Sequence, residues 1–397
     1  MSFSIATTGL NAINEQLNSI SHNIANSGTV GFKSGRAEFS SLYAQNRALG
    51  VGVSGVTQSI TKGGNITATG NGMDLAISGN GFFVVRDNAG GMAYTRAGYF
   101  GTDNSGNLVN NQGMALQGYP VDANGALQVG TVGNLSISSG SIPAKATSNL
   151  NFTANMDANA QVPETTPFDP KDSNSYNNTY ATQVYDSLGR EHTLNQYFVK
   201  TGENTWEAYY YMDGEPLDSP ASQTMEFSEQ GILKTPNGSV NLSMNIAGAE
   251  PLAIDLSYSG TSQYGADFTV SKNQGNGYAS GQKIGQQIDA DGSVYATFSN
   301  GERLLQGQLI LANFANPNGL SSESGTLWTQ TASSGAPLTG APGTGLLGSL
   351  TAGALESSNV DLTAELVGLM TAQRNYQANT KVISTNDSMM SALFQAV

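Results

Sequence analysis

Four short acidic motifs are the first place in this sequence where chemically useful side chains recur at a fixed spacing. In each motif Asp stands first and Gly fourth, and carboxylates of this kind are the ligands that calcium prefers. A calcium-binding loop, however, has its glycine at the sixth position. Asp at the first and Gly at the fourth position favour hairpin turns instead. The motifs are DNSG at Asp103, DANG at Asp122, DSLG at Asp186 and DADG at Asp289.

The histidines and the paired carboxylates offer little more for catalysis. His22 falls within an expected helix and His192 on an expected strand, so we interpret both as isolated surface side chains and not as a zinc site or a catalytic triad. Glu164 and Asp169 have the residue types of a glycosidase pair but lie in a proline-rich loop. The sequence GTGLLG, residues 343–348, matches a dinucleotide-binding pattern without a preceding strand. We therefore expect no catalytic residues, no bound cofactor and no metal site.

The bulk composition excludes several classes of function. The chain has 397 residues, no cysteine and a formal net charge of -14. Because no dense run of Lys or Arg is available to neutralise phosphates, we expect no binding to nucleic acid. The lack of cysteine removes disulfides and thiolate metal sites. No stretch approaches the roughly 18 apolar residues of a membrane span, and residues 1–32, with Glu15 as their only formal charge, lack the pattern of a secretory signal.

The elements that must position any functional side chains begin with an N-terminal helix. Over the first 26 residues the apolar side chains recur at alternating steps of three and four, which is the average period of a coiled-coil seam. Gly28 supplies the stop, because glycine tolerates the left-handed conformation that closes a helix. The apolar stripe of this segment, residues 1–30, consists of Phe3, Ala6, Leu10, Ile13, Leu17, Ile20 and Ile24.

The C-terminal segment, residues 357–397, repeats the same pattern. Apolar residues lie seven apart along it, and neither Gly nor Pro interrupts residues 369–397, so we expect one long helix. Asn359 or Asp361 is suited to cap its N-terminus. The main apolar line is Leu362, Leu369, Tyr376, Ile383, Met390 and Val397, and the neighbouring line includes Leu366 and Phe394.

Two interpretations of these helical ends remain open. From periodicity alone, the simpler one is an intramolecular helical hairpin that lies on a globular body. Fixing about 60 terminal residues, however, costs about 1–2 kcal/mol each in backbone entropy, and a single two-helix seam buries little apolar surface against that cost. If many copies stack, each helix contacts several neighbours, and the ends would become ordered on assembly.

Between the helices the sequence indicates β structure in several parts. Residues 31–70 are rich in Gly, Ser and Thr and are typical of an extended connecting arm. Residues 71–144 and 284–356 share apolar doublets separated by turns, which predicts one middle β domain. The insert, residues 145–283, holds ten of the sixteen tyrosines and a charge of -9, from seven basic and sixteen acidic residues, and predicts an outer β domain. The expected fold is multidomain and mainly β, with one β domain inserted in the other and terminal helices forming a coiled-coil-like inner layer.

Three segments resemble a known family. The sequence from Gly9 to Ser34, GLNAINEQLNSISHNIANSGTVGFKS, is similar to the N-terminal signature of the bacterial flagellar axial proteins, the rod and hook family. LAISGNGFFVV, from Leu75, is similar to an early strand of that family, and residues 355–395 are similar to its C-terminal signature. Ser27 and Gly28 stand where relatives often carry Asn-Thr. The chain length and the inserted domain resemble the hook subunits of the family more than its shorter rod subunits.

The resemblance implies a structural function and no enzymatic activity. Hook subunits stack helically into a curved tube, a universal joint that transmits torque from rod to filament, and their paired terminal helices line an export channel. The implied partners are further copies of the chain, the rod and hook-filament junction proteins, the hook cap and the flagellar type III export apparatus. The implied location is the extracellular hook, reached without a cleavable signal peptide. The alternatives are a shorter distal rod subunit and a secreted β-sheet enzyme or adhesin, which would need a pocket, a metal or a nucleophile.

Overall fold

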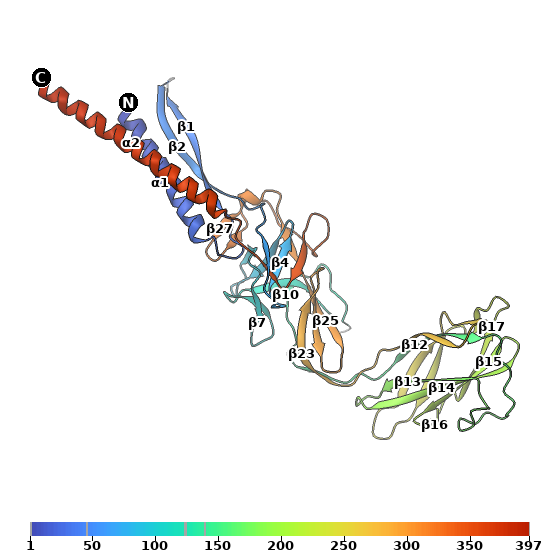
Figure 1. Cartoon of the computed structure of the whole chain (residues 1–397). Helices are drawn as coiled ribbons and strands as arrows, with labels where there is room; N and C mark the ends of the chain where they lie inside the picture. The colour runs from blue at the N-terminus through green and yellow to red at the C-terminus, as the bar shows by residue number, and fades with distance from the viewer. Residues whose placement is uncertain (1, 45–46, 123–124, 139, 397) are drawn as a thin grey trace. The chain divides into compact units, whose positions relative to one another are not determined.

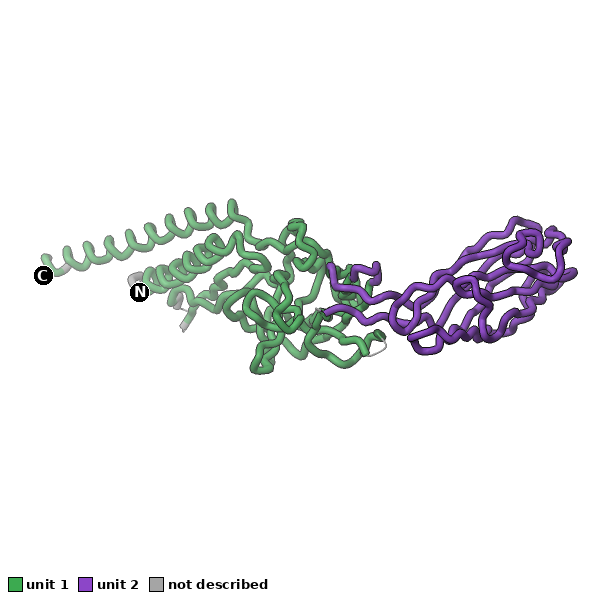
Figure 2. The backbone as a smooth tube through the Cα atoms, turned by 90° about the horizontal axis from the view of Figure 1, so that it is seen from below, with its two compact units in different colours: residues 1–139, 285–297, 303–397 green, residues 140–284, 298–302 purple. Residues whose placement is uncertain are grey.

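The computed structural model describes residues 2–44, 47–122, 125–138 and 140–396. It confirms a mainly β fold with one long helix near each end of the chain (Figure 1). The chain divides into two compact units. Unit 1 comprises residues 1–139, 285–297 and 303–397, and unit 2 comprises residues 140–284 and 298–302 (Figure 2). Among the described residues, neither helix has an apolar stretch long enough to cross a membrane.

The two long helices are α1, Ser2–Ala25, and α2, Leu362–Ala396. The carboxylate of Asp361 accepts hydrogen bonds from the backbone N–H groups of Thr363 and Ala364 at 3.0 and 3.1 Å. These are two of the amides at the start of α2 that have no partner within the helix, so Asp361 is its N-cap. This confirms one of the two predicted caps. The other, Asn359, has a different function that is described below.

A β-hairpin follows α1. Its strands, β1 (Gly35–Ala44) and β2 (Arg47–Gln58), pair antiparallel with Phe39 opposite Val53, and Figure 1 shows them beside α1. The segment expected as one extended arm therefore folds back on itself over much of its length. Its alternating valines have the period of two that any strand requires, and this period does not distinguish a single extended segment from a hairpin.

The rest of unit 1 is a β domain with an aromatic core. Its strands are β3 Ile66–Ala68, β4 Leu75–Ser78, β5 Phe82–Arg86, β6 Met92–Thr95, β7 Phe100–Thr102, β8 Leu108–Asn110, β9 Ala115–Pro120, β10 Gly133–Asn134, β24 Ser293–Phe298, β25 Arg303–Leu309, β26 Leu311–Asn313, β27 Ser321–Glu323, β28 Leu327–Thr329, β29 Leu338–Gly340, β30 Ser349–Ala352 and β31 Ala354–Glu356, with a 3-10 turn at Pro317–Gly319. The main sheet has the order β24-β25-β9-β5-β6-β28-β27. Phe82, Tyr94, Phe314 and Trp328 meet edge to face, with centroids 4.8 to 6.1 Å apart.

Unit 2 is a sandwich of two sheets. Its strands are β12 Asn149–Asp157, β13 Asn178–Tyr185, β14 Glu191–Gly202, β15 Thr205–Met212, β16 Glu215–Pro216, β17 Ser222–Phe227, β18 Leu233–Thr235, β19 Ser239–Met244, β20 Leu252–Ser257, β21 Ser262–Tyr264 and β22 Thr269–Gly275, with β11 Ser141–Ile142 and β23 Gly281–Ile288 where the chain enters and leaves. One sheet has the order β19-β20-β12-β21, and the other β13-β14-β15-β17-β18. Every second residue of β15 is buried, and its Trp206 and Tyr210 belong to the same hydrophobic core as Phe152 of β12.

The four acidic motifs are hairpin turns, as predicted. In each motif the glycine N–H donates to the Asp carbonyl at 3.0 Å. Each glycine also has a φ of 76° to 83°, in the left-handed region that residues other than glycine rarely adopt. The four glycines are Gly106, Gly125, Gly189 and Gly292.

Candidate functional site: the paired terminal helices and their buried anchor

Helices α1 and α2 lie side by side and antiparallel (Figure 1). Asn23 donates a hydrogen bond to the carboxylate of Glu365 at 2.9 Å. Further along, a Cβ on Gly368 would lie 3.4 Å from Ile20, and one on Gly9 would lie 3.1 Å from Asn379. The residue numbers of each pair have the same sum. Each step of one residue back along α1 is therefore matched by a step of one residue forward along α2. Ser2 therefore lies level with Asn386, and the last turns of α2 extend beyond α1.

The contact between the helices is a short apolar seam, and it brings together five of the residues predicted to pack. Ala372, which is completely buried, also belongs to the seam. The predicted line of larger apolar residues spaced seven apart did not include this position. Its small side chain lets the two helices approach closely. The members of the seam are Ile13, Ile20 and Ala372, with Leu17, Ile24 and Leu369 packed against them.

The other residues of the predicted stripes are not brought into this seam. Leu10 and Ile383 are half-buried, whereas five residues of α2 are exposed. Val397 and the side chain of Phe3 lie outside the described residues. Apolar side chains that remain open along one helix are typical of a surface that binds a partner. The five exposed residues are Leu362, Leu366, Tyr376, Met390 and Phe394.

A buried ion cluster follows α1, and no spacing in the sequence indicated it. Lys33 Nζ lies 2.5 Å from Glu356 Oε1, and Arg96 Nη1 lies 3.1 Å from Glu356 Oε2. The three residues are between 1% and 3% exposed. The backbone N–H of Gly64 donates to Glu356 Oε1 at 2.9 Å, and that of Gly31 donates to the Glu356 carbonyl at 2.8 Å. Glu356 thus joins three distant chain segments at the base of the helices.

This cluster holds two cations and one anion in a place that water does not reach. Burial lowers the pKa values of Lys33 and Arg96, and the charge of Glu356 opposes that shift in both. Lys33 Nζ also donates to the Lys62 carbonyl, and Arg96 Nη2 to the Gly79 carbonyl, each at 2.8 Å. The charges therefore depend on Glu356, because its removal would leave two desolvated cations without a counterion.

Two buried asparagines join the same segments to the helices. Asn23, in the NIAN sequence, exchanges two hydrogen bonds of 2.8 Å with the backbone of Gly35 at the start of the hairpin. Asn359 donates from Nδ2 to the carbonyls of Ser59 and Lys62, each at 2.9 Å. Asn359 is therefore a cross-link between the segment that follows the hairpin and the segment before α2.

The histidines only partly match their sequence interpretation. His22 is exposed and meets the ring of Phe32 edge to face, with centroids 5.3 Å apart. His192, in unit 2, is not isolated, since its Nδ1 lies 2.6 Å from Asp213 Oδ2 and its Nε2 lies 3.3 Å from Asp186 Oδ2. The interpretation of His192 was wrong because the turns that end β13 and β15 bring two carboxylates together from different parts of the chain.

Asp186 is the centre of this second polar cluster. Its carboxylate accepts hydrogen bonds from Arg190 Nε at 2.7 Å and from the backbone N–H groups of Leu188 and Arg190. Burial acts to raise the pKa of Asp186, but the hydrogen bonds from Arg190, His192 and Leu188 outweigh it and lower the pKa to about 2. The arrangement holds the DSLG turn in place, so we interpret it as structural.

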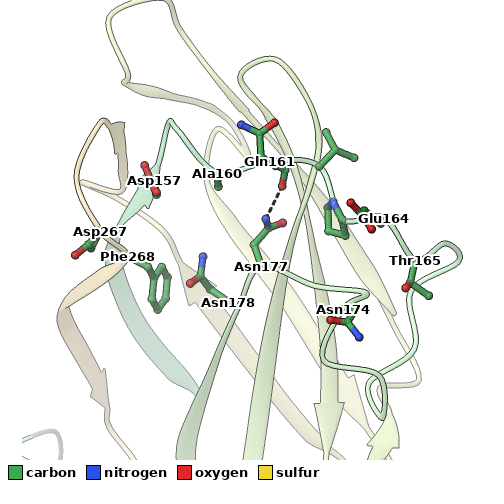
Figure 3. Close-up of a pocket in the computed structure, with 12 residues that line it drawn as sticks. Asp157, Ala160, Gln161, Glu164, Thr165, Asn174, Asn177, Asn178, Asp267 and Phe268 are labelled. Atoms are coloured by element: carbon green, nitrogen blue, oxygen red, sulfur yellow. Dashed lines mark hydrogen bonds between the residues drawn. The ribbon is translucent and has the colours of Figure 1, made fainter.

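Unit 2 also has a wide polar hollow of about 820 Å³ (Figure 3). Glu164 lines it, but Asp169, with which it could have formed a glycosidase pair, does not. Asn177 Nδ2 donates to the Gln161 carbonyl beside the hollow at 2.7 Å. Within the described residues, no group of three or more His, Asp or Glu side chains is placed to hold a metal ion. We assign no chemistry to this hollow.

Comparison with protein families matches most of the chain. Residues 76–162 match the flagellar hook protein FlgE/F/G D1 domain. Residues 149–278 match the flagellar basal body protein FlaE D2 domain. Residues 351–396, which include the whole of α2, match the C-terminal region of the flagellar basal body rod FlgEFG proteins. Both the β segments and the C-terminal helix thus resemble flagellar proteins.

Curated relatives match over nearly the full length. The flagellar hook protein FlgE of Salmonella typhimurium is 43% identical over 402 residues, and that of Escherichia coli K12 is 43% identical over 400 residues. Each alignment covers 99% of both chains. Among solved structures, the crystal structure of Helicobacter pylori flagellar hook protein FlgE2 has a TM-score of 0.52 at 14% identity, covering 68% of this chain and 96% of that chain. This last likeness concerns the fold alone.

Proposed function

The chain belongs to the flagellar hook protein family, and from this premise we propose that it is a structural subunit that assembles with its own copies into the bacterial flagellar hook. The observation that carries the proposal is the identity of 43% to named hook proteins over 99% of the chain. This full-length agreement does not favour a distal rod subunit, and it does not favour a secreted enzyme or adhesin.

Subunit packing through the terminal helices is the second part of the proposal. In one subunit the exposed side of α2 has no cover from the described residues, so its apolar side chains remain available to neighbours. In a stack of copies each helix contacts several others, which adds apolar burial that one helix pair lacks. The packing residues are Phe3, Leu10, Ile13, Leu17, Ile20, Ile24, Leu362, Leu366, Leu369, Tyr376, Ile383, Met390, Phe394 and Val397.

Unit 2 supports a different kind of contact. Residues 145–283 carry a charge of -9. Because copies of this domain repel each other, contacts between them should retain water and should not be closely packed. Polar contacts through water can shift at small cost. A curved tube that rotates as a universal joint requires such contacts, because each row of subunits shortens and lengthens once per turn. We therefore assign the permanent joints to the helices and the sliding contacts to unit 2.

The same premise extends to location and partners. The assembled tube would stand outside the cell, transmit torque from rod to filament and enclose the export channel. Its partners would be the rod and hook-filament junction proteins, the hook cap and the flagellar type III export apparatus. These partners follow from membership of the family and from no surface of this chain in particular.

Electron microscopy of the concentrated full-length chain tests the proposal. We expect tubes from the unmodified chain and none from a double variant, Leu362→Asp with Leu366→Asp. Both leucines are exposed in the subunit, so the variant keeps its fold while charge on the open line opposes packing. Leu188→Asp, which changes an exposed leucine of unit 2, is the matched control and should assemble normally. Normal tubes from the double variant would contradict the proposal.

A second variant separates the helix pair from the β cores. Leu17→Asp with Ile20→Asp places two charges in the seam within each subunit, so both the helix pair and the assembly should be lost. The chain has two tryptophans, Trp206 in the core of unit 2 and Trp328 in that of unit 1. Their fluorescence should remain native in this variant.

A further inference from the structure

An apolar groove of about 330 Å³ lies between the helix pair and the β-hairpin of unit 1. Three small residues, Gly9, Ala12 and Ala378, leave the space open, and Phe39 and Val51 face it from the hairpin. The exposed fraction of Phe39 is 40%, so a large aromatic side chain there is only partly covered. The groove has the size and the lining of a site that receives an apolar side chain.

The far end of α2, residues 388–396, has the complementary character. It extends beyond the start of α1, since Ser2 lies level with Asn386. Met389 and Phe394 are 60% and 78% exposed, and residues 388–397 include no charged side chain. A helix end that presents large apolar side chains to water, without charges, favours burial against another surface. We call residues 388–396 the tip.

The tip and the groove of one chain cannot meet. Phe394 lies sixteen residues beyond Ala378 on the same continuous helix, which is about 24 Å at about 1.5 Å per residue. A contact between these two surfaces must therefore join different copies. Because the surfaces differ, the contact is heterologous, and repeated heterologous contacts that do not close into a ring produce open helical polymers.

We propose that the tip of one copy inserts into the groove of a second copy, with Phe394 as its anchor. This inference rests on the proposed self-assembly and names the surfaces through which it occurs. Charge supports this occupant, because the tip has no charged side chain and none of the described residues that line the groove is charged. Docking of the tip therefore buries apolar surface without desolvating charges. The proposal also explains why small residues recur on the sides of α1 and α2 that border the groove.

Crosslinking between two single-cysteine variants tests the contact. The chain has no cysteine of its own, so reactions report only the introduced thiols. Gln16→Cys labels the groove, and Ser391→Cys labels the tip one turn before Phe394. When the two variants polymerise together, a short thiol-reactive crosslinker should produce covalent dimers that contain one of each. Leu188→Cys, mixed with Ser391→Cys, is the control and should produce none.

Polymerisation of Phe394→Ser provides the second measurement. We expect its critical concentration for assembly to rise by about tenfold or more, since a buried Phe side chain is replaced by a polar one. Leu346→Ser, which changes a leucine that is 75% exposed in unit 1, should polymerise as the unmodified chain does. Because Phe394 has no partner within the subunit among the described residues, the variant should keep native tryptophan fluorescence.

The outcomes separate this inference from the function that it rests on. Tubes that form without crosslinks between the groove and tip labels would overturn the inference and leave the hook function standing. A critical concentration for Phe394→Ser equal to that of the unmodified chain would do the same. If the unmodified chain forms no tubes at any concentration, the proposed self-assembly fails and this inference fails with it.

Discussion

Replacing Glu356 with Gln is the sharpest test of the buried anchor. The side chain of Lys33 is 0% exposed and that of Arg96 is 4% exposed, so neither cation can turn to water when the carboxylate is removed. A Gln amide can accept one of their hydrogen bonds, but its NH₂ group then faces a second donor. Breaking a buried ion pair by removal of one partner costs about 3–5 kcal/mol, a large part of the roughly 5–15 kcal/mol that stabilises a typical domain.

Tryptophan fluorescence measures this cost in unit 1 alone. In a Trp206→Phe background the remaining Trp328, buried in the core of unit 1, reports urea unfolding of that unit. The free energy of unfolding should fall by about 3–5 kcal/mol in Glu356→Gln. The control is Glu38→Gln, which breaks the exposed pair with Arg36 and should cost far less, because water screens an exposed ion pair. Equal losses in the two variants would refute the reasoning.

The pH dependence distinguishes lost charge pairing from a general packing defect. Burial already lowers the pKa of Lys33 from 10.5, and Glu356 is the main group that opposes the shift. Without Glu356 the pKa of Lys33 in the folded state falls further below its unfolded value. The unfolded state then binds more protons, so stability rises with pH and the deficit of Glu356→Gln should shrink as the pH rises towards 10.5, the ordinary pKa of lysine. A deficit that is independent of pH would contradict this account.

Two further predictions concern single turns. Gly31 has a φ of 70°, and a Cβ there would lie 2.5 Å from the backbone nitrogen of Ala97, so Gly31→Ala should destabilise unit 1 by more than about 1 kcal/mol in urea unfolding. Gly113→Ala is the control, because Gly113 has a φ of 77° but open space around it, so this variant measures only the cost of the backbone conformation. An equal loss of stability in the two variants would exclude a contribution from the steric clash at Gly31. Asp186 has a folded pKa of about 2 against an ordinary 3.8, so its contribution is complete above about pH 4 and is lost as pH falls towards 2. Asp186→Asn should therefore be less stable than the unmodified chain at neutral pH by Trp206 fluorescence, and the difference should shrink in this acid range.

Much of the architecture could be predicted from local patterns. Residues 145–283 were predicted to form a β domain, and within it the alternation of TWEAYYYM places Trp206 and Tyr210 on the buried side of β15. The apolar stripe from Ile13 to Ile24 predicted a helix with one apolar face, and that face packs on α2. Such patterns succeed because the period of the side chains along a helix or a strand is a property of a few neighbouring residues.

The candidate site was predicted only in part. Ile20 and Leu369 were identified from their spacing, but Ala372, which belongs to the same seam, was not, because alanine contributes little to an apolar pattern. The interpretation of His192 as isolated was wrong for a related reason. Its partner Asp213 is 21 residues away in the sequence, and no local spacing indicates that two turns meet.

The sequence by itself determined which segments are helical, which strands have a buried side and where the acidic turns close. These features depend on interactions between residues a few positions apart. Only the tertiary structure decided that Lys33 meets Glu356, 323 residues later. It also decided that α1 begins level with Asn386, so that the tip of α2 extends beyond α1 and leaves Met389 and Phe394 exposed. The physical reason is that spacing states which side of an element is apolar, whereas the path of the whole chain decides whether that side is covered and which distant charges share a buried place.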